Sequence, residues 1–174
     1  IALYDVVGID TAVLAGKTMS AAFPDRAEDS PLLEALVEQG RFGQKSGQGF
    51  YAYTSGKKRG TDDPDLEPIL EAHRRDNRSF GTEEMVARMM VPMLVEASRA
   101  LEDGIVRDAR DVDLGMIFGI GFPPFRGGPL FWADSLGGEA LGALIEPLTS
   151  LGPLYEITPL IAEIIEGKRT FYEN

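Results

Sequence analysis

The clearest pattern of apolar and polar positions runs from Thr82 to Gly104, where apolar side chains recur every fourth residue. The recurring positions are Met85, Met89, Met93, Ala97 and Leu101. This spacing matches one face of an α-helix and predicts a long amphipathic helix with a methionine-rich core stripe. Thr82 is the expected N-cap, Pro92 is expected to kink the helix without ending it, and Gly104 is expected to terminate it.

Shorter helices are predicted on both sides of this one. Three of them follow a capping residue placed directly before a proline, the arrangement preferred at a helix start: Ser30-Pro31, Asp63-Pro64 and Thr158-Pro159. The predicted ranges are 31–39, 64–74, 109–118, 138–150 and 159–166. A further helix is expected from a cap at Asp10 or Thr11 to Pro24, after the buried positions Leu3, Val6, Val7 and Ile9. The pattern contains no alternation of strands and helices, so the predicted fold class is all-α.

An apolar stretch rich in glycine and proline, from Gly115 to Gly137, interrupts these helices. Pro123 and Pro124 remove backbone donors, and the glycines permit close approach or positive φ. One cation, Arg126, stands among the aromatic residues Phe118, Phe122, Phe125, Phe131 and Trp132. We expect a rigid, non-helical corner that is buried against helices on both sides, with Arg126 paired or pointing to water.

Composition narrows the class of protein. The chain has 174 residues, of which 44% are hydrophobic, as in ordinary globular proteins. Its net charge of −11 argues against nucleic acid or an anionic membrane as a partner, and the absence of cysteine excludes disulfides and thiolate chemistry.

The longest uncharged apolar run, Leu114 to Phe125, is too short to span a bilayer. The chain opens on Ile1 without a signal-peptide pattern, and we interpret it as a fragment.

A short internal repeat connects the two ends of the chain. Residues 1–10 align with residues 130–139 at a constant offset, which matches Asp5 with Asp134 and Gly8 with Gly137. Chance similarity is the alternative explanation for so short a match. If the match is a true repeat, residues 1–60 are the remainder of a first helical copy, 61–81 a linker with a short helix, and 82–174 a complete second copy.

Most motifs that suggest chemistry have a simpler structural explanation. The motif Gly119-Ile-Gly121 resembles the start of a dinucleotide fingerprint, but Pro124 stands at the third glycine and a helix precedes it. The turn 43–49 lacks the glycine that a phosphate-binding loop needs before its lysine, so Lys45 is only a weak candidate for contact with a phosphate or CoA. His73, the only histidine, is expected on the surface. The acidic pairs Asp62-Asp63 and Asp111, Asp113 are interpreted as caps and solvated faces and not as metal ligands.

Arg126 is the one polar residue for which the sequence suggests a role beyond the fold. As the only cation of an aromatic corner it is a candidate for functional contact, and the alternative is an ion pair between domains. The candidates for substrate or interface contact are Lys45, Phe122, Phe125 and Arg126. No residue is assigned to catalysis, to a cofactor or to a metal.

Two motifs, in this order, resemble the C-terminal region of 3-hydroxyacyl-CoA dehydrogenases. The first is Phe42-Gly-Gln-Lys-Ser-Gly-Gln-Gly-Phe-Tyr, and the second combines Met89-Met-Val-Pro-Met with Gly119-Ile-Gly-Phe-Pro-Pro-Phe-Arg-Gly-Gly. Within the family, the chain is most similar to the multifunctional α subunit of the bacterial fatty-acid β-oxidation complex, over essentially all of its length. The resemblance implies a helical bundle of the 6-phosphogluconate dehydrogenase C-terminal-like type, as a tandem repeat whose first copy is truncated.

The resemblance also implies where the chemistry lies. In this family a Rossmann domain binds NAD and carries a His-Glu catalytic dyad, while the helical domain closes over the acyl-CoA. The dyad, the glycine fingerprint and the substrate-contacting Asn of the first helical copy would all precede Ile1. In the second copy Ala87 or a neighbour takes the position of that Asn. Residues 82–174 are therefore expected to be non-catalytic and to occupy the place of the dimer partner in single-copy relatives.

Two functional hypotheses follow. In the first, the chain is the helical part of an NAD-dependent bacterial, cytoplasmic 3-hydroxyacyl-CoA dehydrogenase; it helps to form the acyl-CoA cleft beside Rossmann and enoyl-CoA hydratase domains, and it is inactive alone. In the second, it is a non-catalytic module that docks a thiolase subunit or mediates self-association. Exposed apolar area around Phe122, Phe125, Phe131 and Trp132 would favour the second hypothesis.

Overall fold

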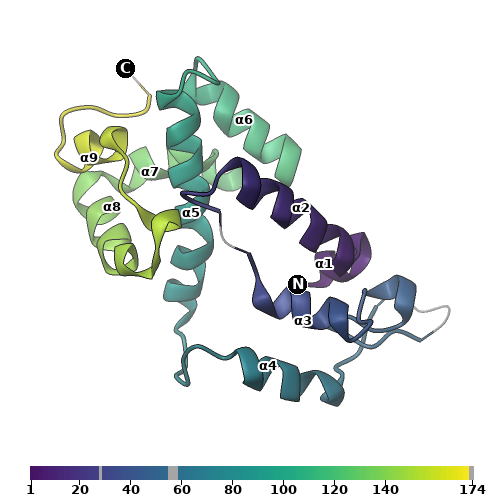
Figure 1. Cartoon of the computed structure of the whole chain (residues 1–174). Helices are drawn as coiled ribbons and strands as arrows, with labels where there is room; N and C mark the ends of the chain where they lie inside the picture. The colour runs from purple at the N-terminus through teal and green to yellow at the C-terminus, as the bar shows by residue number, and fades with distance from the viewer. Residues whose placement is uncertain (28, 55–58, 173–174) are drawn as a thin grey trace. The chain divides into compact units, whose positions relative to one another are not determined.

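The structure is a computed structural model that describes residues 1–27, 29–54 and 59–172 (Figure 1). These residues form helices joined by turns, and their only β-type pairings are isolated bridges in the segment 43–61. The all-α prediction is confirmed. None of the helices in the described ranges has the length and apolarity needed to cross a bilayer. The chain forms two compact units, Ile1–Arg78 and Ser79–Asn174, and we describe each by itself.

The first unit packs its helices around a small apolar core. Its elements are α1 (Ala2–Val7), α2 (Ile9–Ala22), α3 (Pro31–Glu38), η1 (Gln44–Ser46), η2 (Pro64–Leu66) and α4 (Glu67–His73). Helix α3 lies against α2 on one side and α4 on the other. The core consists of Ile9, Leu36, Phe50, Leu66 and Ile69. Ser30 caps α3 by accepting a hydrogen bond from the Leu33 N–H, as the Ser-Pro pair predicts.

Two expectations for the start of this unit are wrong. Of the four positions expected to be buried, only Ile9 is; Leu3, Val6 and Val7 are 71%, 61% and 55% exposed, because they lie on a face of α1 that no other described helix of the unit covers. The cap at Asp10 or Thr11 is also wrong. Gly8, at φ 105°, separates α1 from α2, so α2 begins at Ile9 without a side-chain cap.

The second unit surrounds the long helix α5. Its elements are α5 (Thr82–Glu102), α6 (Ala109–Ile120), η3 (Pro124–Arg126), α7 (Pro129–Leu136), α8 (Gly138–Ile145), η4 (Glu146–Leu151), η5 (Pro153–Tyr155) and α9 (Pro159–Ile165). Helix α5 contacts α6, α7, α8 and α9. Thr158 caps α9 as expected, and Asp108 caps α6 by accepting a hydrogen bond from the Arg110 N–H. The helix expected over 138–150 becomes 3₁₀ from Glu146, where Pro147 cannot donate an α-helical hydrogen bond.

Helix α5 exists as predicted, but its buried face only partly follows the predicted stripe. Its buried positions are Ala87, Val91, Leu94, Val95, Ala97 and Ser98, whereas Met85 and Met89 are 45% and 58% exposed. Apolar residues occupy much of the circumference of α5, and the packing of α7 and α9 selects the valine and leucine side. Thr82 is not the cap, because Gly81 holds the N-cap position. The helix continues through Pro92, as expected.

The aromatic corner is shorter and more exposed than expected. Of this stretch, only residues 121–128 and Gly137 lie outside α-helices, because the second half forms α7, which begins at Pro129 after two glycines with positive φ. Proline is well suited to the first helical position. Phe122 and Trp132 are buried, but Phe118, Phe125 and Phe131 are 84%, 83% and 50% exposed within this unit. The expectation that the whole corner is buried is therefore wrong for three of its five aromatic residues.

Candidate functional site

Lys45 lies in the first unit and is already occupied by an acidic partner. Its ammonium group donates to both carboxylate oxygens of Asp10, at 2.5 and 2.6 Å, and lies 5.9 Å from the centre of the Phe42 ring. The hydrogen bond from Lys45 lowers the pKa of Asp10. A phosphate group would have to displace Asp10 to reach Lys45. The role of Lys45 in phosphate or CoA contact stays a prediction.

The other predicted residues belong to the second unit, which places them in different surroundings. The Phe122 side chain is 2% exposed and therefore belongs to the packed interior. Arg126 is exposed beside Phe125, with its guanidinium 5.7 Å from the ring centre. Within the described part of the chain Arg126 makes no ion pair. Phe125 and Arg126 thus form a cation–π pair at the surface, while Phe122 is not available to a ligand there.

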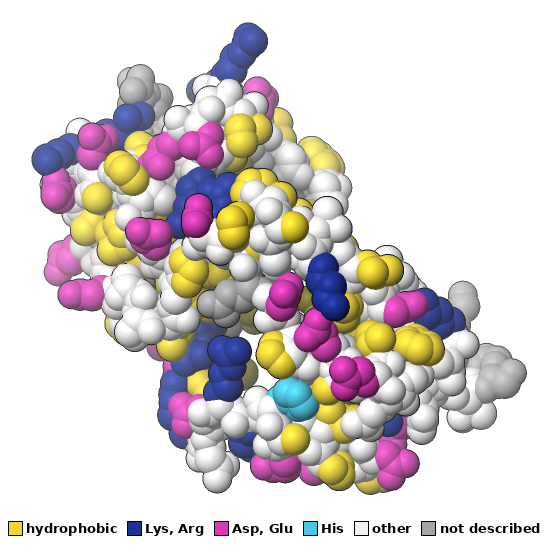
Figure 2. Space-filling view, in the orientation of Figure 1, with side chains coloured by type: hydrophobic (Ala, Val, Ile, Leu, Met, Phe, Trp, Pro, Cys, Tyr) yellow, Lys and Arg dark blue, Asp and Glu magenta, His cyan; other side chains and the backbone are white. Residues whose placement is uncertain are grey.

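His73 lies at the end of α4, where its ring Nδ1 is 2.8 Å from the carbonyl oxygen of Ile69. Its side chain is half-buried, and it is the cyan side chain in the surface view of Figure 2. Acidic, basic and apolar side chains are interspersed on the face drawn there. A histidine with a backbone partner and no neighbouring carboxylate among its described contacts lacks the orienting group of a catalytic dyad.

The motif Gly119-Ile-Gly121 does not fit a dinucleotide. It forms the end of α6, with Gly121 in the left-handed conformation as the C-cap, φ 74° and ψ 31°. The pyrophosphate of NAD binds at a helix N-terminus, where backbone N–H groups and the positive end of the helix dipole meet it. The C-terminus of α6 presents carbonyl oxygens and the negative end of the dipole. We therefore assign no step of the chemistry to this motif.

One carboxylate in each unit, the buried Asp5 and the half-buried Asp134, fixes a Phe-Tyr pair. In the first unit Asp5 accepts hydrogen bonds from the backbone N–H groups of Phe50 and Tyr51, at 2.8 and 3.0 Å. In the second unit Asp134 accepts from the N–H groups of Phe171 and Tyr172, both at 2.9 Å. Sequence reasoning paired the two aspartates but missed their partners, although the Phe-Tyr dipeptide also occurs in both halves.

Asp113 on α6 is a second organising carboxylate of this unit, and it is buried, so the expectation of a solvated face is wrong for this residue. It accepts from the N–H groups of Leu130 and Phe131 at the start of α7, and from the Tyr172 hydroxyl at 2.7 Å. Burial and the neighbouring Asp113 raise the pKa of Tyr172 well above its usual value. The phenol is therefore a fixed hydrogen-bond donor to Asp113 at neutral pH.

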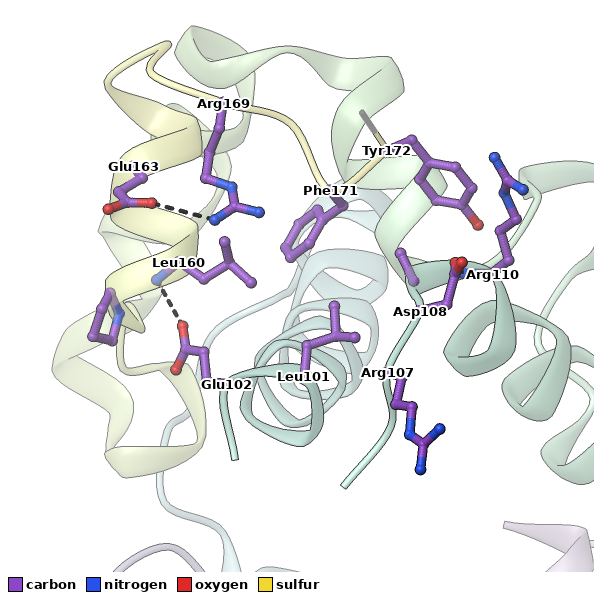
Figure 3. Close-up of a pocket in the computed structure, with 12 residues that line it drawn as sticks. Leu101, Glu102, Arg107, Asp108, Arg110, Leu160, Glu163, Arg169, Phe171 and Tyr172 are labelled. Carbon is purple, nitrogen blue, oxygen red and sulfur yellow. Dashed lines mark hydrogen bonds and ion pairs between the residues drawn. The ribbon is translucent and has the colours of Figure 1, made fainter. Parts of the chain in front are cut away.

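The second unit also contains a cavity that the sequence did not predict (Figure 3). Its volume is about 660 Å³, within the size range of small-molecule sites. The end of α5, the start of α6, helix α9 and the segment 169–172 enclose it, and Leu101, Leu160 and Phe171 supply apolar surface. Residues from position 101 to position 172 come together here only through tertiary packing, so no local pattern marks the site.

Charged side chains form the rim of this cavity. Arg107, Arg110 and Arg169 supply three guanidinium groups, while Glu102, Asp108 and Glu163 supply three carboxylates. Glu102 accepts a hydrogen bond from the Leu160 N–H at 2.6 Å, and Asp108 accepts from the Arg110 N–H at 2.8 Å. Arg169 lies 3.7 Å from Glu163. In the described ranges neither Arg107 nor Arg110 has an ion-pair partner.

Comparison with known proteins identifies relatives along the whole chain. A family model described as the C-terminal domain of 3-hydroxyacyl-CoA dehydrogenase matches residues 1–53 and 85–169. The fatty acid oxidation complex subunit alpha of Pseudomonas savastanoi pv. phaseolicola is 41% identical over 175 residues, which cover 98% of this chain and 24% of that protein. The same subunit of Pseudomonas entomophila gives the same values. The chain thus spans about a quarter of the length of these relatives.

Solved structures of two dehydrogenases share the fold. The dehydrogenase part of multifunctional enzyme 1 from C. elegans gives a TM-score of 0.68 at 21% identity, over 94% of this chain and 38% of that one. The 3-hydroxybutyryl-CoA dehydrogenase of Escherichia coli gives a TM-score of 0.69 at 17% identity, and the match covers 97% of this chain and 52% of that chain. At these identities the likeness shows the fold alone. Because the family model matches both segments, the chain belongs to the 3-hydroxyacyl-CoA dehydrogenases and corresponds to their C-terminal domain.

Proposed function

We propose that the chain is the C-terminal helical part of a multifunctional fatty-acid oxidation protein, in which it helps to form the acyl-CoA cleft of an NAD-dependent dehydrogenase. The reaction is the oxidation of 3-hydroxyacyl-CoA to 3-oxoacyl-CoA in the bacterial cytoplasm. The observation that carries the proposal is that one family model matches two segments, 1–53 and 85–169. In this proposal residues 1–60 complete a first helical copy, 61–81 link it to the next, and 82–174 form a second copy.

Structural parallels support a tandem arrangement. Asp5 and Asp134 hold the Phe-Tyr pairs in the same way, through two backbone N–H groups each. Each aspartate is followed three residues later by a glycine with positive φ, Gly8 at 105° and Gly137 at 78°, which separates one helix from the next. Later in each unit, a helix starts at a proline behind a hydroxyl cap, at Ser30 and Thr158.

We place nucleotide binding and proton transfer in a Rossmann domain outside this chain, with an enoyl-CoA hydratase domain further upstream. The relatives named fatty acid oxidation complex subunit alpha are about four times as long as this chain, which leaves room for both domains. NAD supplies the hydride acceptor when it is bound there. In this proposal the helical chain shapes the wall of the acyl-CoA cleft and is inactive on its own.

Truncation of the longer protein tests the proposed role in the cleft. We expect removal of residues 82–174 to lower kcat/KM for the reduction of acetoacetyl-CoA by NADH about a hundredfold, because a mispositioned substrate loses that much. The Kd for NADH should not change, which shows that the Rossmann domain remains folded. Unchanged kcat/KM in the truncated protein would refute a role in the cleft.

A second function, as a docking or oligomerisation module, is favoured by the exposed apolar surface of the second unit. Phe118 and Phe125 are among its most exposed side chains, and an apolar groove of about 540 Å³ lies between α5 and α6. Large exposed apolar patches mark interaction sites. Light scattering reports self-association, and capture of a purified thiolase subunit reports docking. If Arg126→Ala in the longer protein abolishes assembly and leaves kcat/KM intact, docking replaces cleft formation as the function.

A further inference from the structure

We propose that an exposed apolar face of the first unit, the α1 face, receives a helical hairpin from the upstream part of the longer protein. The α1 face consists of Ile1, Leu3, Tyr4 and Val7. A carboxylate of this hairpin, which corresponds to α5 and α6 of the second unit, accepts a hydrogen bond from the Tyr51 hydroxyl. The inference rests on the proposed function, which places the chain in a longer tandem protein, and it adds the partner of α1 and its contacts.

The two units bury corresponding helices to very different extents. The register that matches Asp5 with Asp134 also matches α1 with α7. Three positions of this helix are buried in the second unit, at 0%, 6% and 0% exposure: Leu130, Trp132 and Ala133. The same three positions are 69%, 71% and 43% exposed in the first unit: Ile1, Leu3 and Tyr4. The first unit thus presents to solvent an apolar surface that the second unit keeps in its core.

Helices α5 and α6 cover this surface in the second unit, because α7 packs against both (Figure 1). Trp132 belongs to one apolar core with Val91 and Leu94 of α5. In the first unit α1 packs against α2 and η1, and its described residues include no counterpart of α5 or α6. A contiguous exposed apolar surface marks an interface. In the longer protein a hairpin joined directly to α1 reaches this surface at a high effective concentration.

The Tyr51 hydroxyl indicates a polar contact with the same hairpin. Tyr51 corresponds to Tyr172, because Asp5 and Asp134 hold the N–H groups of these two tyrosines in the same way. In the second unit the Tyr172 hydroxyl donates to Asp113 on α6 at 2.7 Å. The Tyr51 hydroxyl makes no hydrogen bond within the described ranges. A carboxylate at the position of Asp113 on the upstream hairpin supplies the acceptor.

A second copy of this chain is a poorer partner for the α1 face. The helices of the second unit that combine the required apolar face with a carboxylate are α5 and α6, and both are already packed against α7. Asp113 holds the N–H groups of Leu130 and Phe131 as well as the Tyr172 hydroxyl. This hairpin would have to leave its own unit before it could cover α1 of another chain.

Thiol labelling at two positions of α1 tests the proposal, because the chain has no cysteine of its own. Leu3→Cys places a thiol on the α1 face. Val6→Cys is the matched control, because Val6 is 61% exposed and its counterpart Ser135 stays exposed beside α5 and α6. Both variants of the 174-residue chain should react rapidly with a maleimide.

The same two variants of the longer protein should differ. Peptide mapping by mass spectrometry identifies the labelled position there. Leu3→Cys should react at least about a hundredfold more slowly than in the 174-residue chain, because the thiol reacts only when the hairpin opens. Val6→Cys should react at the same rate in both proteins. Equal slowing of the two thiols would overturn the proposal, because it would show general protection of α1 and not a cover on one face.

Two further variants of the longer protein test the occupant. Tyr51→Phe removes the hydrogen bond to the hairpin, so it should speed the labelling of Leu3→Cys about tenfold, and it should have no effect in the shorter chain. An unchanged rate in the longer protein would refute this contact. Deletion of the segment before Ile1, matched in length to residues 82–129, should restore rapid labelling. Protection that survives the deletion would show that another part of the protein covers α1, and the proposal would fail.

Reduction of acetoacetyl-CoA, measured on the same preparations, separates this proposal from the proposed function. Rapid labelling of Leu3→Cys in an active longer protein overturns the hairpin and leaves the proposed function standing. Slow labelling in an inactive longer protein supports the hairpin and counts against the proposed function. Labelling of the 174-residue chain that is already slow, or that slows as its concentration rises, would assign the α1 face to this chain or to a second copy and overturn the proposal.

Discussion

Asp5 joins segments of the first unit that are 45 or more residues apart in the sequence. Its carboxylate is 1% exposed and accepts hydrogen bonds from the Phe50 and Tyr51 N–H groups and from the Tyr53 hydroxyl. A buried carboxylate is tolerated only when it is fully hydrogen-bonded, so the surrounding backbone must approach closely. Gly49 permits this approach, because a Cβ atom at that position would lie 2.1 Å from the Asp5 carboxylate.

Gly49→Ala should therefore lower the free energy of unfolding of the first unit by about 2–3 kcal/mol, the cost of overpacking a tight site. Gly16→Ala is the matched control. Nothing lies within 4 Å of a Cβ atom at Gly16 in α2, so alanine should stabilise the helix by roughly 0.5–1 kcal/mol. Urea unfolding followed by circular dichroism measures both changes. Equal effects of the two substitutions would contradict the packing described around Asp5.

Tyr53 makes the stability of the first unit sensitive to alkaline pH. Burial and its hydrogen bond to Asp5 raise the pKa of Tyr53 from 10.0 to about 12. The folded state thus holds the phenolic proton more tightly than the unfolded state. The contribution of the protonated Tyr53 to the unfolding free energy is therefore complete below pH 10 and is lost as the pH rises to about 12. Unfolding free energies measured from pH 9 to 12 should fall more steeply for the parent chain than for Tyr53→Phe. Parallel curves would show that Tyr53 has no such role.

A buried ion pair joins the segment 40–49 to the region of η2 and α4. Arg41 donates to the Asp63 carboxylate at 2.6 Å and to the Gly49 carbonyl oxygen at 3.0 Å, and both charged side chains are about 5% exposed. The hydrogen bond from Arg41 lowers the pKa of Asp63. Asp63 also caps η2 by accepting from the Asp65 N–H.

Asp63→Asn should cost about 3–5 kcal/mol of unfolding free energy in the first unit, because it leaves the Arg41 charge buried without its partner. Glu34→Gln breaks the exposed pair with Lys17 and should change the stability by less than about 1 kcal/mol. Fluorescence of Trp132, the only tryptophan, follows the second unit and should keep its unfolding midpoint in both variants. A loss of less than about 1 kcal/mol in Asp63→Asn would contradict the role of this pair.

Helices that begin with a capping residue could be predicted from the sequence, whereas features that depend on tertiary packing could not. Ser30 and Thr158 each cap the helix that they predict, since a cap acts on the next three residues. The buried face of α5 depends on α7 and α9, which no local spacing reveals. Helix α7 was missed because the glycines and prolines before it suggested that the whole stretch was irregular. The charged cavity was missed because its residues lie on four separate segments.

Across the whole chain, the two units share a succession of features. A carboxylate on a short helix, a glycine with positive φ, a helix that starts at proline, and a Phe-Tyr pair occur in this order in each. The paired aspartates and glycines were recognisable in the sequence because they keep a constant offset. Their shared hydrogen-bond partners emerge only from the structure, since each Phe-Tyr pair lies far along the chain from its aspartate. All these features position backbone, and we assign none of them to proton or hydride transfer.

The central claim is that this chain supplies helical structure and that the dehydrogenase chemistry lies outside it. The most direct test is to follow NADH oxidation at 340 nm with acetoacetyl-CoA as substrate, comparing the purified 174-residue chain with the longer protein. The account predicts saturable turnover by the longer protein and a rate no higher than the enzyme-free blank for the chain. Saturable, NADH-dependent turnover by the chain alone would contradict it.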